Sequence, residues 1–221
     1  MTRKDGLICA LRETGVVAVI RTENPVDLGA VARALHEGGI KFIEITMTIP
    51  WALEIIKEVV RGLRDLDIYV GAGTVLDAET ARMAILAGSH FIVGPTFDQG
   101  TVDLCHSYGI PVMPGAMTPT EILRAWKGGA DVVKVFPAQN VGGPDFLKAV
   151  KEPLPQIELL PTKGVDFETA GAFIKAGAIA VGVGGALVPK AMMAARDYPA
   201  ITSNARRMIQ IVREARTGSA R

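Results

Sequence analysis

The sequence predicts an α/β fold in which eight parallel strands alternate with helices and close into a (β/α)8 barrel, the TIM-barrel arrangement. Short apolar, β-rich runs recur at even spacing, and stretches with apolar residues three and four positions apart lie between them. Glycine, which readily takes the left-handed conformation that a helix end needs, ends four of the predicted helices. These glycines are Gly39, Gly88, Gly129 and Gly177, and each of the three intervals between them spans two strand-helix units. With one unit before the first glycine and one after the last, eight units are expected.

The predicted elements follow one another through a single domain, residues 1–221, a length that suits one barrel. A helix over residues 1–14 precedes the first strand, and a helix with a tail over residues 198–221 ends the chain. The eight expected strands cover residues 16–21, 42–46, 68–74, 91–95, 111–117, 132–137, 157–163 and 180–187.

An open, doubly wound sheet is the alternative architecture. It is disfavoured because no G-x-G-x-x-G motif follows the first strand and because the eight units are similar in size. The core is expected to be mainly aliphatic, since 49% of the residues are apolar and only 5% are aromatic. In a barrel, reacting groups are expected at the carboxyl ends of the strands.

The charge balance argues against two classes of partner. Lys and Arg number 24 against 23 Asp and Glu, so no concentrated basic face for nucleic acid or an acidic membrane is expected. Cys9 and Cys105 have no metal-ligand spacing and are too few for a disulfide framework. We therefore expect no metal site and a reducing cytoplasm, and neither a signal peptide nor an apolar segment of membrane-spanning length is expected.

Lys134 is unusual for a predicted strand, because every neighbour within two positions is apolar. Strand alternation places Lys134 on one face with Val132 and Phe136, and one face of each barrel strand lines the lumen. An ammonium there loses hydration, which favours the neutral amine and the lone pair that Schiff-base chemistry requires. The alternative is a lysine that faces outward past a helix, or one that only pairs with a carboxylate.

Glu44 repeats this pattern in the second predicted strand, where it shares a face with Phe42 and Thr46. If Glu44 faces Lys134 across the lumen, its carboxylate pairs with the ammonium and relays protons directly or through one water. The alternative is a structural ion pair that takes no part in chemistry.

Groups suited to binding anions stand at the ends of several predicted strands. Glycine turns that lead into helices offer free backbone N–H groups, and the loops after the seventh and eighth strands of barrels commonly bind phosphate. Each such residue alone is a common turn residue, but their shared position at strand ends favours a ligand site. They are Arg21, Thr74, Thr162, Lys163, Gly164, Gly184 and Gly185.

Several motifs together match a known family. In chain order they are EITMTIP with Glu44, GAGTV with Thr74, GP with Pro95, MPGAMTPTE, KVFPA with Lys134 and Phe136, PTKGV, and GVGGALV. In this combination the chain resembles the bacterial aldolases for 2-keto-3-deoxy-6-phosphogluconate (KDPG) and 4-hydroxy-2-oxoglutarate (KHG). The resemblance runs in register from about Gly15 to Pro189, most of the chain.

The resemblance implies a homotrimer of barrels and a class I aldolase mechanism without metal or cofactor. The expected substrate is a small 2-keto-3-deoxy sugar acid, which is cleaved to pyruvate and a phosphorylated aldehyde, glyceraldehyde 3-phosphate. Lys134 would form the Schiff base with the C2 ketone, and Glu44 would move protons through a water. The resemblance also implies a carboxylate contact for Thr74, pyruvyl-pocket walls for Pro95 and Phe136, and a phosphate site for Gly164, Gly184 and Gly185.

Three positions depart from the family pattern. Thr48 stands where some members carry an arginine for the substrate carboxylate, which leaves that contact to Arg21 and Thr74. Lys163 replaces a glycine of a PTGG motif, and Gly185 replaces a phosphate-binding serine. The gained ammonium is consistent with phosphate held by a point charge, or with a different anionic tail on the substrate. Lys163 is also a rival nucleophile, although its position at a strand end leaves it better solvated.

Three classes of function follow from the sequence. The leading one is cleavage of KDPG, with KHG or 2-keto-3-deoxy-6-phosphogalactonate as alternative substrates of the same chemistry. A phosphosugar isomerase or epimerase on the same barrel would use Glu44 as a base without covalent chemistry. A non-catalytic barrel that binds phosphorylated metabolites is the third.

Overall fold

The computed structural model describes residues 2–22 and 27–218, in which helices and strands alternate. In chain order they are α1 (Arg3–Thr14), β1 (Val16–Ile20), α2 (Leu28–Glu37), β2 (Phe42–Thr46), α3 (Ala52–Gly62), β3 (Tyr69–Gly73), α4 (Ala78–Leu86), β4 (Phe91–Val93), α5 (Gln99–Ser107), β5 (Val112–Met113), β6 (Gly115–Ala116), α6 (Pro119–Lys127), β7 (Val133–Val135), the 3-10 helix η1 (Gln139–Val141), α7 (Gly143–Lys151), β8 (Leu159–Pro161), α8 (Ala170–Lys175), β9 (Val181–Val183), α9 (Lys190–Ala194) and α10 (Tyr198–Thr217).

Each of the eight predicted strand segments contains an observed strand, and the strands pair in parallel. One curled sheet has the order β5-β4-β3-β2-β1-β9, and a second has the order β6-β7-β8. The predicted fifth strand is divided into β5 and β6 at Pro114, because a proline nitrogen has no hydrogen to donate to a strand ladder. The prediction of an α/β fold with a parallel sheet is confirmed.

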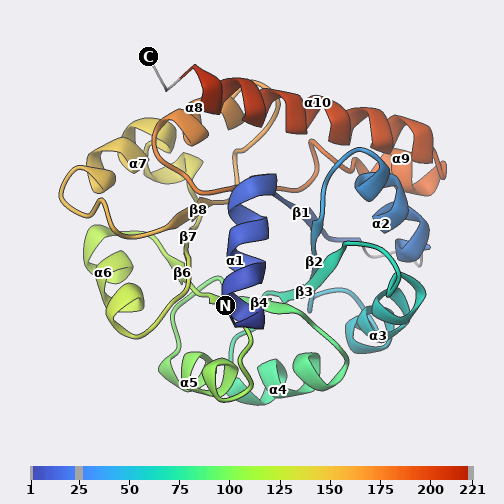
Figure 1. Ribbon diagram of the computed structural model, residues 1–221, viewed down its shortest axis with the longest axis horizontal. Helices are drawn as coiled ribbons and strands as arrows, with labels where there is room; N and C mark the ends of the chain where they lie inside the picture. The colour runs from blue at the N-terminus through green and yellow to red at the C-terminus, as the bar shows by residue number, and fades with distance from the viewer. Residues whose placement is uncertain (1, 23–26, 219–221) are drawn as a thin grey trace.

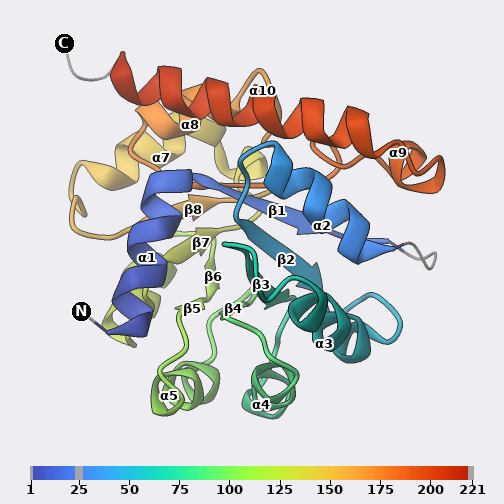
Figure 2. The ribbon, with the colours of Figure 1, turned by 45° about the vertical axis from the view of Figure 1, so that its right-hand side comes forward.

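Helices surround the strands. In Figure 1, α1 crosses the centre of the view in front of the strands, while α2 to α8 and α10 lie around the periphery. In Figure 2 the arrowheads of β1 and β2 point away from α1. The helix α1 therefore covers the amino ends of the strands, and the carboxyl ends lie on the opposite side of the molecule.

The buried apolar residues form two clusters that correspond to the two faces of the strands. The inner cluster packs Leu7 and Leu11 of α1 against one set of strand residues: Val17, Phe42, Phe91, Val93, Met113, Val132 and Leu160. The outer cluster packs the alternate residues, such as Ile43 and Val133, against the helices. One face of each of these strands therefore points toward the inside of the curled sheets.

The four glycines predicted at helix ends all have the left-handed backbone conformation. Their φ angles are 96° at Gly39, 107° at Gly88, 101° at Gly129 and 99° at Gly177. The prediction from the repeated helix-to-strand passages is confirmed at each of them, because a side chain in this conformation would be strained.

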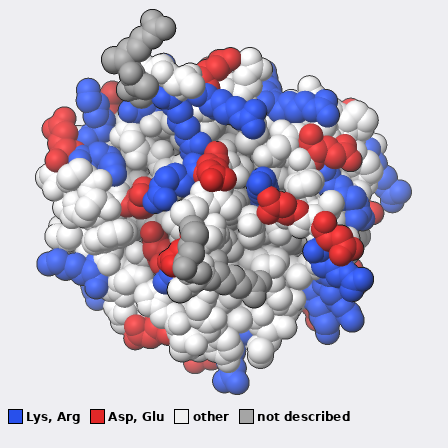
Figure 3. All heavy atoms as spheres, in the orientation of Figure 1, with Lys and Arg blue, Asp and Glu red and all other residues white. Residues whose placement is uncertain are grey.

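The predicted terminal helices are present within the described residues. Helix α1 starts after the N-cap residue Thr2, and α10 ends at Thr217; the predicted ends at residue 1 and residues 219–221 lie outside the described residues. Arg216 of α10 donates hydrogen bonds to the backbone oxygens of Glu13 and Ile179, which ties the two termini together. Figure 3 shows Lys and Arg side chains along the edge that α10 forms, with acidic side chains interspersed over the rest of this face. Within the described ranges, every helix is too short or too polar to cross a membrane.

Candidate active site

A buried pair of opposite charges lies in the space that the strands surround. The Nζ atom of Lys134, on β7, is 3.8 Å from the Oε1 atom of Glu44, on β2, and the two side chains are 6% and 2% exposed. Val132 belongs to the inner cluster, whereas Val133 and Val135 belong to the outer one, so strand alternation turns Lys134 inward. The structure thus brings together the two residues that the sequence singled out from strands 90 residues apart.

The 3.8 Å separation of Glu44 and Lys134 is that of an ion pair, but it is too long for a direct hydrogen bond. The Oε1 atom of Glu44 is buried and has no hydrogen-bond partner among the described residues. A carboxylate oxygen without a partner carries a desolvation cost, which a water or a substrate hydroxyl can offset. At 3.8 Å, one water at about 2.8 Å from each atom can bridge the pair.

Gly73, at the end of β3, leaves the space that Glu44 occupies. A Cβ atom placed on Gly73 would lie 1.9 Å from the Oε1 atom of Glu44, a contact that forces the carboxylate to move. The glycine of the GAGT motif is therefore explained by the close approach of the carboxylate to the β3 backbone. Strand β3 in this way fixes the position of a side chain that belongs to β2.

The aromatic ring of Phe136 lies beside the amine of Lys134. The Nζ atom of Lys134 is 5.3 Å from the centre of this ring, within the range of a cation–π interaction. Two pockets share Phe136 as a wall, so the ring stands between them.

The first pocket has a volume of about 390 Å³ and gathers most of the anion-binding residues that the sequence predicted. Thr162 lines it, and the buried hydroxyl of this residue has no hydrogen-bond partner among the described residues. Lys190, which the sequence analysis did not single out, also lines this pocket. The predicted residues among its walls are Arg21, Phe136, Thr162, Lys163, Gly164, Gly184 and Gly185.

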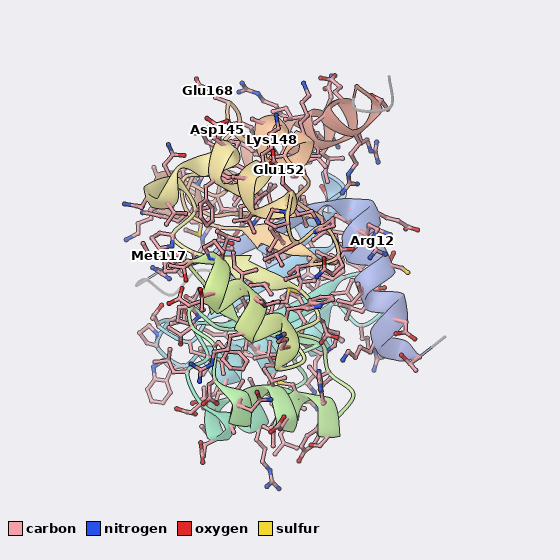
Figure 4. The ribbon with its side chains drawn as sticks, turned by 90° about the vertical axis from the view of Figure 1, so that its left-hand side faces the viewer. Arg12, Met117, Asp145, Lys148, Glu152 and Glu168 are labelled. Atoms are coloured by element: carbon pink, nitrogen blue, oxygen red, sulfur yellow. The ribbon has the colours of Figure 1, made fainter. Side chains whose placement is uncertain are left out.

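The second pocket has a volume of about 480 Å³ and lies on the other side of Phe136. Pro95, which the sequence predicted as a pocket wall, lines it together with Met117 and Arg124. Figure 4 shows Met117 on the side of the molecule opposite α1, where Arg12 is labelled. This pocket therefore opens at the carboxyl ends of the strands, as a barrel active site does.

Two predicted residues stand apart from these pockets. Thr48 is exposed, and its hydroxyl lies 2.9 Å from the hydroxyl of Thr46. Thr74 is half-buried with a left-handed backbone, φ 59°. Neither residue lines the two pockets described above. Within the described ranges, no three His, Cys, Asp or Glu side chains gather in a way that could hold a metal ion.

Lys190 and Arg124 line the two pockets but carry no signal in the sequence, each for a different reason. Lys190 begins a helix of five residues beyond the last glycine-rich motif, and nothing in its neighbours marks it. Arg124 sits in an amphipathic helix, where a charged residue on the polar face is ordinary. A contact between a helix and the loop of another strand leaves no local pattern in the sequence.

Comparison with known proteins assigns the chain to a family. A sequence model of the KDPG and KHG aldolases matches residues 7–204. The chain belongs to this aldolase family.

Individual relatives agree with this assignment. The chain is 34% identical over 203 residues to the 2-dehydro-3-deoxy-phosphogluconate aldolase of Treponema pallidum, an alignment that covers 92% of the chain and 96% of the relative. It is 28% identical over 195 residues to the KHG/KDPG aldolase of Escherichia coli, covering 88% and 89% of the two chains. The crystal structure of the 2-keto-3-deoxy-6-phosphogluconate aldolase of Zymomonas mobilis with 3-phosphoglycerate superposes with a TM-score of 0.81 at 28% identity, covering 90% of this chain and 93% of the relative.

Proposed function

We propose that this family member is a class I aldolase that cleaves KDPG to pyruvate and glyceraldehyde 3-phosphate through a Schiff base on Lys134. The observation that carries the proposal is the buried amine of Lys134 at 3.8 Å from the carboxylate of Glu44. Membership of the KDPG and KHG aldolase family supports the same reaction.

Covalent catalysis begins at the amine. Glu44 takes a proton from the ammonium of Lys134, and the neutral amine adds to the C2 ketone of the substrate to give a carbinolamine. Glu44 returns this proton to the carbinolamine hydroxyl, which leaves as water, so that an iminium ion and the Glu44 carboxylate remain. The positive iminium nitrogen then accepts the electron pair of the C3–C4 bond when that bond breaks.

Proton transfer accompanies the cleavage. The carboxylate of Glu44, acting through a water, removes the proton of the C4 hydroxyl, so that C4 leaves as the aldehyde carbon of glyceraldehyde 3-phosphate. The enamine that remains on Lys134 is protonated at C3, and water hydrolyses the resulting iminium to release pyruvate and the free amine. The unpaired Oε1 atom of Glu44 supports this role, because it has an open acceptor position toward the amine.

The two pockets suit the two ends of the substrate. Pro95 and Phe136 would wall the pyruvyl part, while Thr162, Lys163 and the glycine loops would hold the phosphate. Because Thr48 is exposed and its hydroxyl lies beside that of Thr46, we assign the carboxylate contact to Arg21, which lines the first pocket, and to the half-buried Thr74. The residues given to the phosphate site are Thr162, Lys163, Gly164, Gly184 and Gly185.

KHG is the second candidate substrate. The relative from Escherichia coli is named for both KHG and KDPG. Both substrates share the 2-keto acid that forms the Schiff base, so the catalytic pair serves either one. 2-Keto-3-deoxy-6-phosphogalactonate, the epimer of KDPG, would use the same groups.

We further propose that the two sheets close into one (β/α)8 barrel that forms a single domain. An isolated bridge between Thr162 and Gly182, and a hydrogen bond of 3.1 Å from the Ile179 nitrogen to the Leu159 oxygen, support closure between β8 and β9. On the other side, only Pro114 separates β5 from β6.

We also propose a homotrimer that works in the cytoplasm. Exposed apolar side chains on loops after the strands, Trp51, Leu76 and Met117, support an interface between copies. The free thiols of Cys9 and Cys105 support a reducing compartment.

Pyruvate release tests the proposed function. The wild type and a Lys134→Ala variant are each given a panel of 2-keto-3-deoxy acids with and without phosphate, together with KHG. We expect the wild type to release pyruvate fastest from KDPG and the variant to lose essentially all activity while its circular dichroism stays unchanged. Pyruvate release by the folded variant at the wild-type rate would refute the role of Lys134.

A further inference from the structure

The pocket of about 480 Å³ lies next to the strand that carries Lys134. Pro95 and Phe97 line it from the loop after β4, and Phe136 lines it from the end of β7. Gly115, another wall residue, is paired with Lys134 in the β6–β7 ladder. Neighbouring strands of a sheet lie about 4.8 Å apart, so this pocket begins one strand away from the backbone of the lysine.

The loop after β4 is fixed against β6. A Cβ atom placed on Gly115 would lie 2.0 Å from the Pro95 oxygen, so the glycine permits this close approach. The Gly115 nitrogen donates a hydrogen bond to the Thr96 oxygen at 3.3 Å. The wall that Pro95 and Phe97 form is therefore held in a defined position relative to β6 and to the neighbouring Lys134.

Arg124 brings a positive charge to this pocket. It lies on α6, and its guanidinium carbon is 5.8 Å from the centre of the Phe97 ring, within the range of a cation–π interaction. The ring itself packs against the end of α6, since a Cβ atom on Gly128 would lie 2.5 Å from it. Within the described ranges, no ion pair or hydrogen bond engages the guanidinium, which leaves it open to an anionic ligand.

The carboxylate in the same pocket is already engaged elsewhere. Glu121 also lines the pocket, but its Oε2 atom accepts hydrogen bonds from the Met117 and Thr118 nitrogens at 2.8 and 2.9 Å. These bonds cap the first turn of α6 and hold the pKa of Glu121 below its usual range. Because this carboxylate serves the cap, Arg124 stays available to a ligand.

The two candidate substrates differ in where their second anionic group lies. In KHG a carboxylate is attached directly to C4, whereas in KDPG the phosphate is attached to C6. Since Glu44 acts on the C4 hydroxyl, the second carboxylate of KHG must stay close to the catalytic pair and to the wall of Pro95 and Phe136. A guanidinium presents two N–H groups in a planar fork that matches the two oxygens of a carboxylate.

We propose that Arg124 binds the second carboxylate of 2-keto dicarboxylic acids such as KHG and sets the preference of the enzyme between KHG and KDPG. This inference rests on the proposed function. At the same position KDPG carries a neutral hydroxylated carbon, which offers the guanidinium no charge to pair with. Arg124 is therefore a specificity-determining residue that favours one of the two substrates.

Calorimetric binding of 2-oxoglutarate and of 2-oxopentanoate tests the inference without turnover. 2-Oxoglutarate has the ketone and both carboxylates of KHG but lacks the C4 hydroxyl, so it is not cleaved. 2-Oxopentanoate has a methyl group in place of the second carboxylate. We expect Arg124→Gln to bind 2-oxoglutarate roughly ten- to a hundredfold more weakly than the wild type, with little change for 2-oxopentanoate.

The control variant is Lys127→Gln, which removes one charge from an exposed lysine in the last turn of the same helix and should bind both ligands as the wild type does. Steady-state kinetics gives a second readout. The ratio of kcat/KM for KHG to kcat/KM for KDPG should fall roughly ten- to a hundredfold in Arg124→Gln and stay at the wild-type value in Lys127→Gln.

Two binding results would overturn the role of Arg124. One is wild-type affinity for 2-oxoglutarate in Arg124→Gln, and the other is a wild type that binds 2-oxoglutarate no more tightly than 2-oxopentanoate. Because calorimetry measures binding alone, a protein that passes this test but releases no pyruvate would refute the aldolase proposal and leave the carboxylate site standing. A protein that releases pyruvate but fails the binding test would refute the carboxylate site alone.

Discussion

The Oε1 atom of Glu44 lies 3.8 Å from the Nζ atom of Lys134, and both side chains are almost completely buried. Buried ion pairs contribute little to the free energy of unfolding, because the desolvation of both charges costs about as much free energy as their attraction provides. The pair is better explained by chemistry than by stability, since the carboxylate oxygen that faces the amine has no hydrogen bond.

The first prediction concerns Glu44→Gln. The amide keeps the shape of the carboxylate but accepts no proton, so kcat for pyruvate release should fall roughly 10²- to 10⁴-fold. Stopped-time assays with KDPG measure it. The control Glu58→Gln removes an exposed carboxylate of α3 and should keep the wild-type rate. Equal rates in the wild type and Glu44→Gln would show that Glu44 is only structural.

The second prediction concerns Gly73→Ala. The added Cβ would meet the Glu44 carboxylate and displace it, which should lower kcat roughly a hundredfold, the effect expected from a misplacement of about 1 Å. In the matched control Gly62→Ala, the added Cβ meets nothing within 4 Å, so that variant should keep the wild-type rate. A fully active Gly73→Ala enzyme would contradict the positioning role of β3.

The third prediction concerns Thr162→Val. Valine keeps the volume of threonine but removes a buried hydroxyl that has no partner among the described residues, so the free energy of unfolding should stay the same or rise by up to about 1 kcal/mol. The same change should raise KM for KDPG about tenfold, because the ligand loses one hydrogen bond. Denaturant unfolding and steady-state kinetics measure the two effects. A drop in stability with unchanged KM would contradict a role in ligand binding.

The fourth prediction follows from the thiol of Cys105. Burial raises its pKa from 9.0 to about 12. Because the folded protein holds this proton more tightly than the unfolded chain, the resulting stability is present below pH 9 and is lost as the pH rises toward 12. The melting temperature of the wild type should therefore fall more steeply between pH 9 and pH 11 than that of Cys105→Ala. Parallel pH profiles for the two proteins would contradict it.

The order of the elements is predictable from the sequence because it depends on local patterns. The left-handed glycines Gly39, Gly88, Gly129 and Gly177 end helices in the structure as they do in the prediction. The division of the predicted fifth strand was also predictable from Pro114, since a proline inside a strand removes a ladder hydrogen bond.

The site was predictable only in part. Strand alternation around Lys134 and Glu44 predicts which way each side chain faces, but the distance between them depends on the curl of the sheet and on the missing side chain at Gly73. Thr48 is exposed and its hydroxyl lies 2.9 Å from that of Thr46, a contact that the motif did not predict, and its role toward the substrate stays a prediction. Lys190 lines the pocket of about 390 Å³ from the start of α9, and no sequence motif predicts this position.

The most direct test of the Schiff base is reductive trapping. The wild type is incubated with pyruvate and sodium borohydride, digested, and mapped by mass spectrometry, with Lys134→Ala and Lys163→Gly treated alike. The structure predicts the mass of a reduced pyruvyl adduct on Lys134 in the wild type and in Lys163→Gly, and no adduct in Lys134→Ala. An adduct on Lys163 with Lys134 unmodified, or no adduct in the wild type, would contradict the central claim.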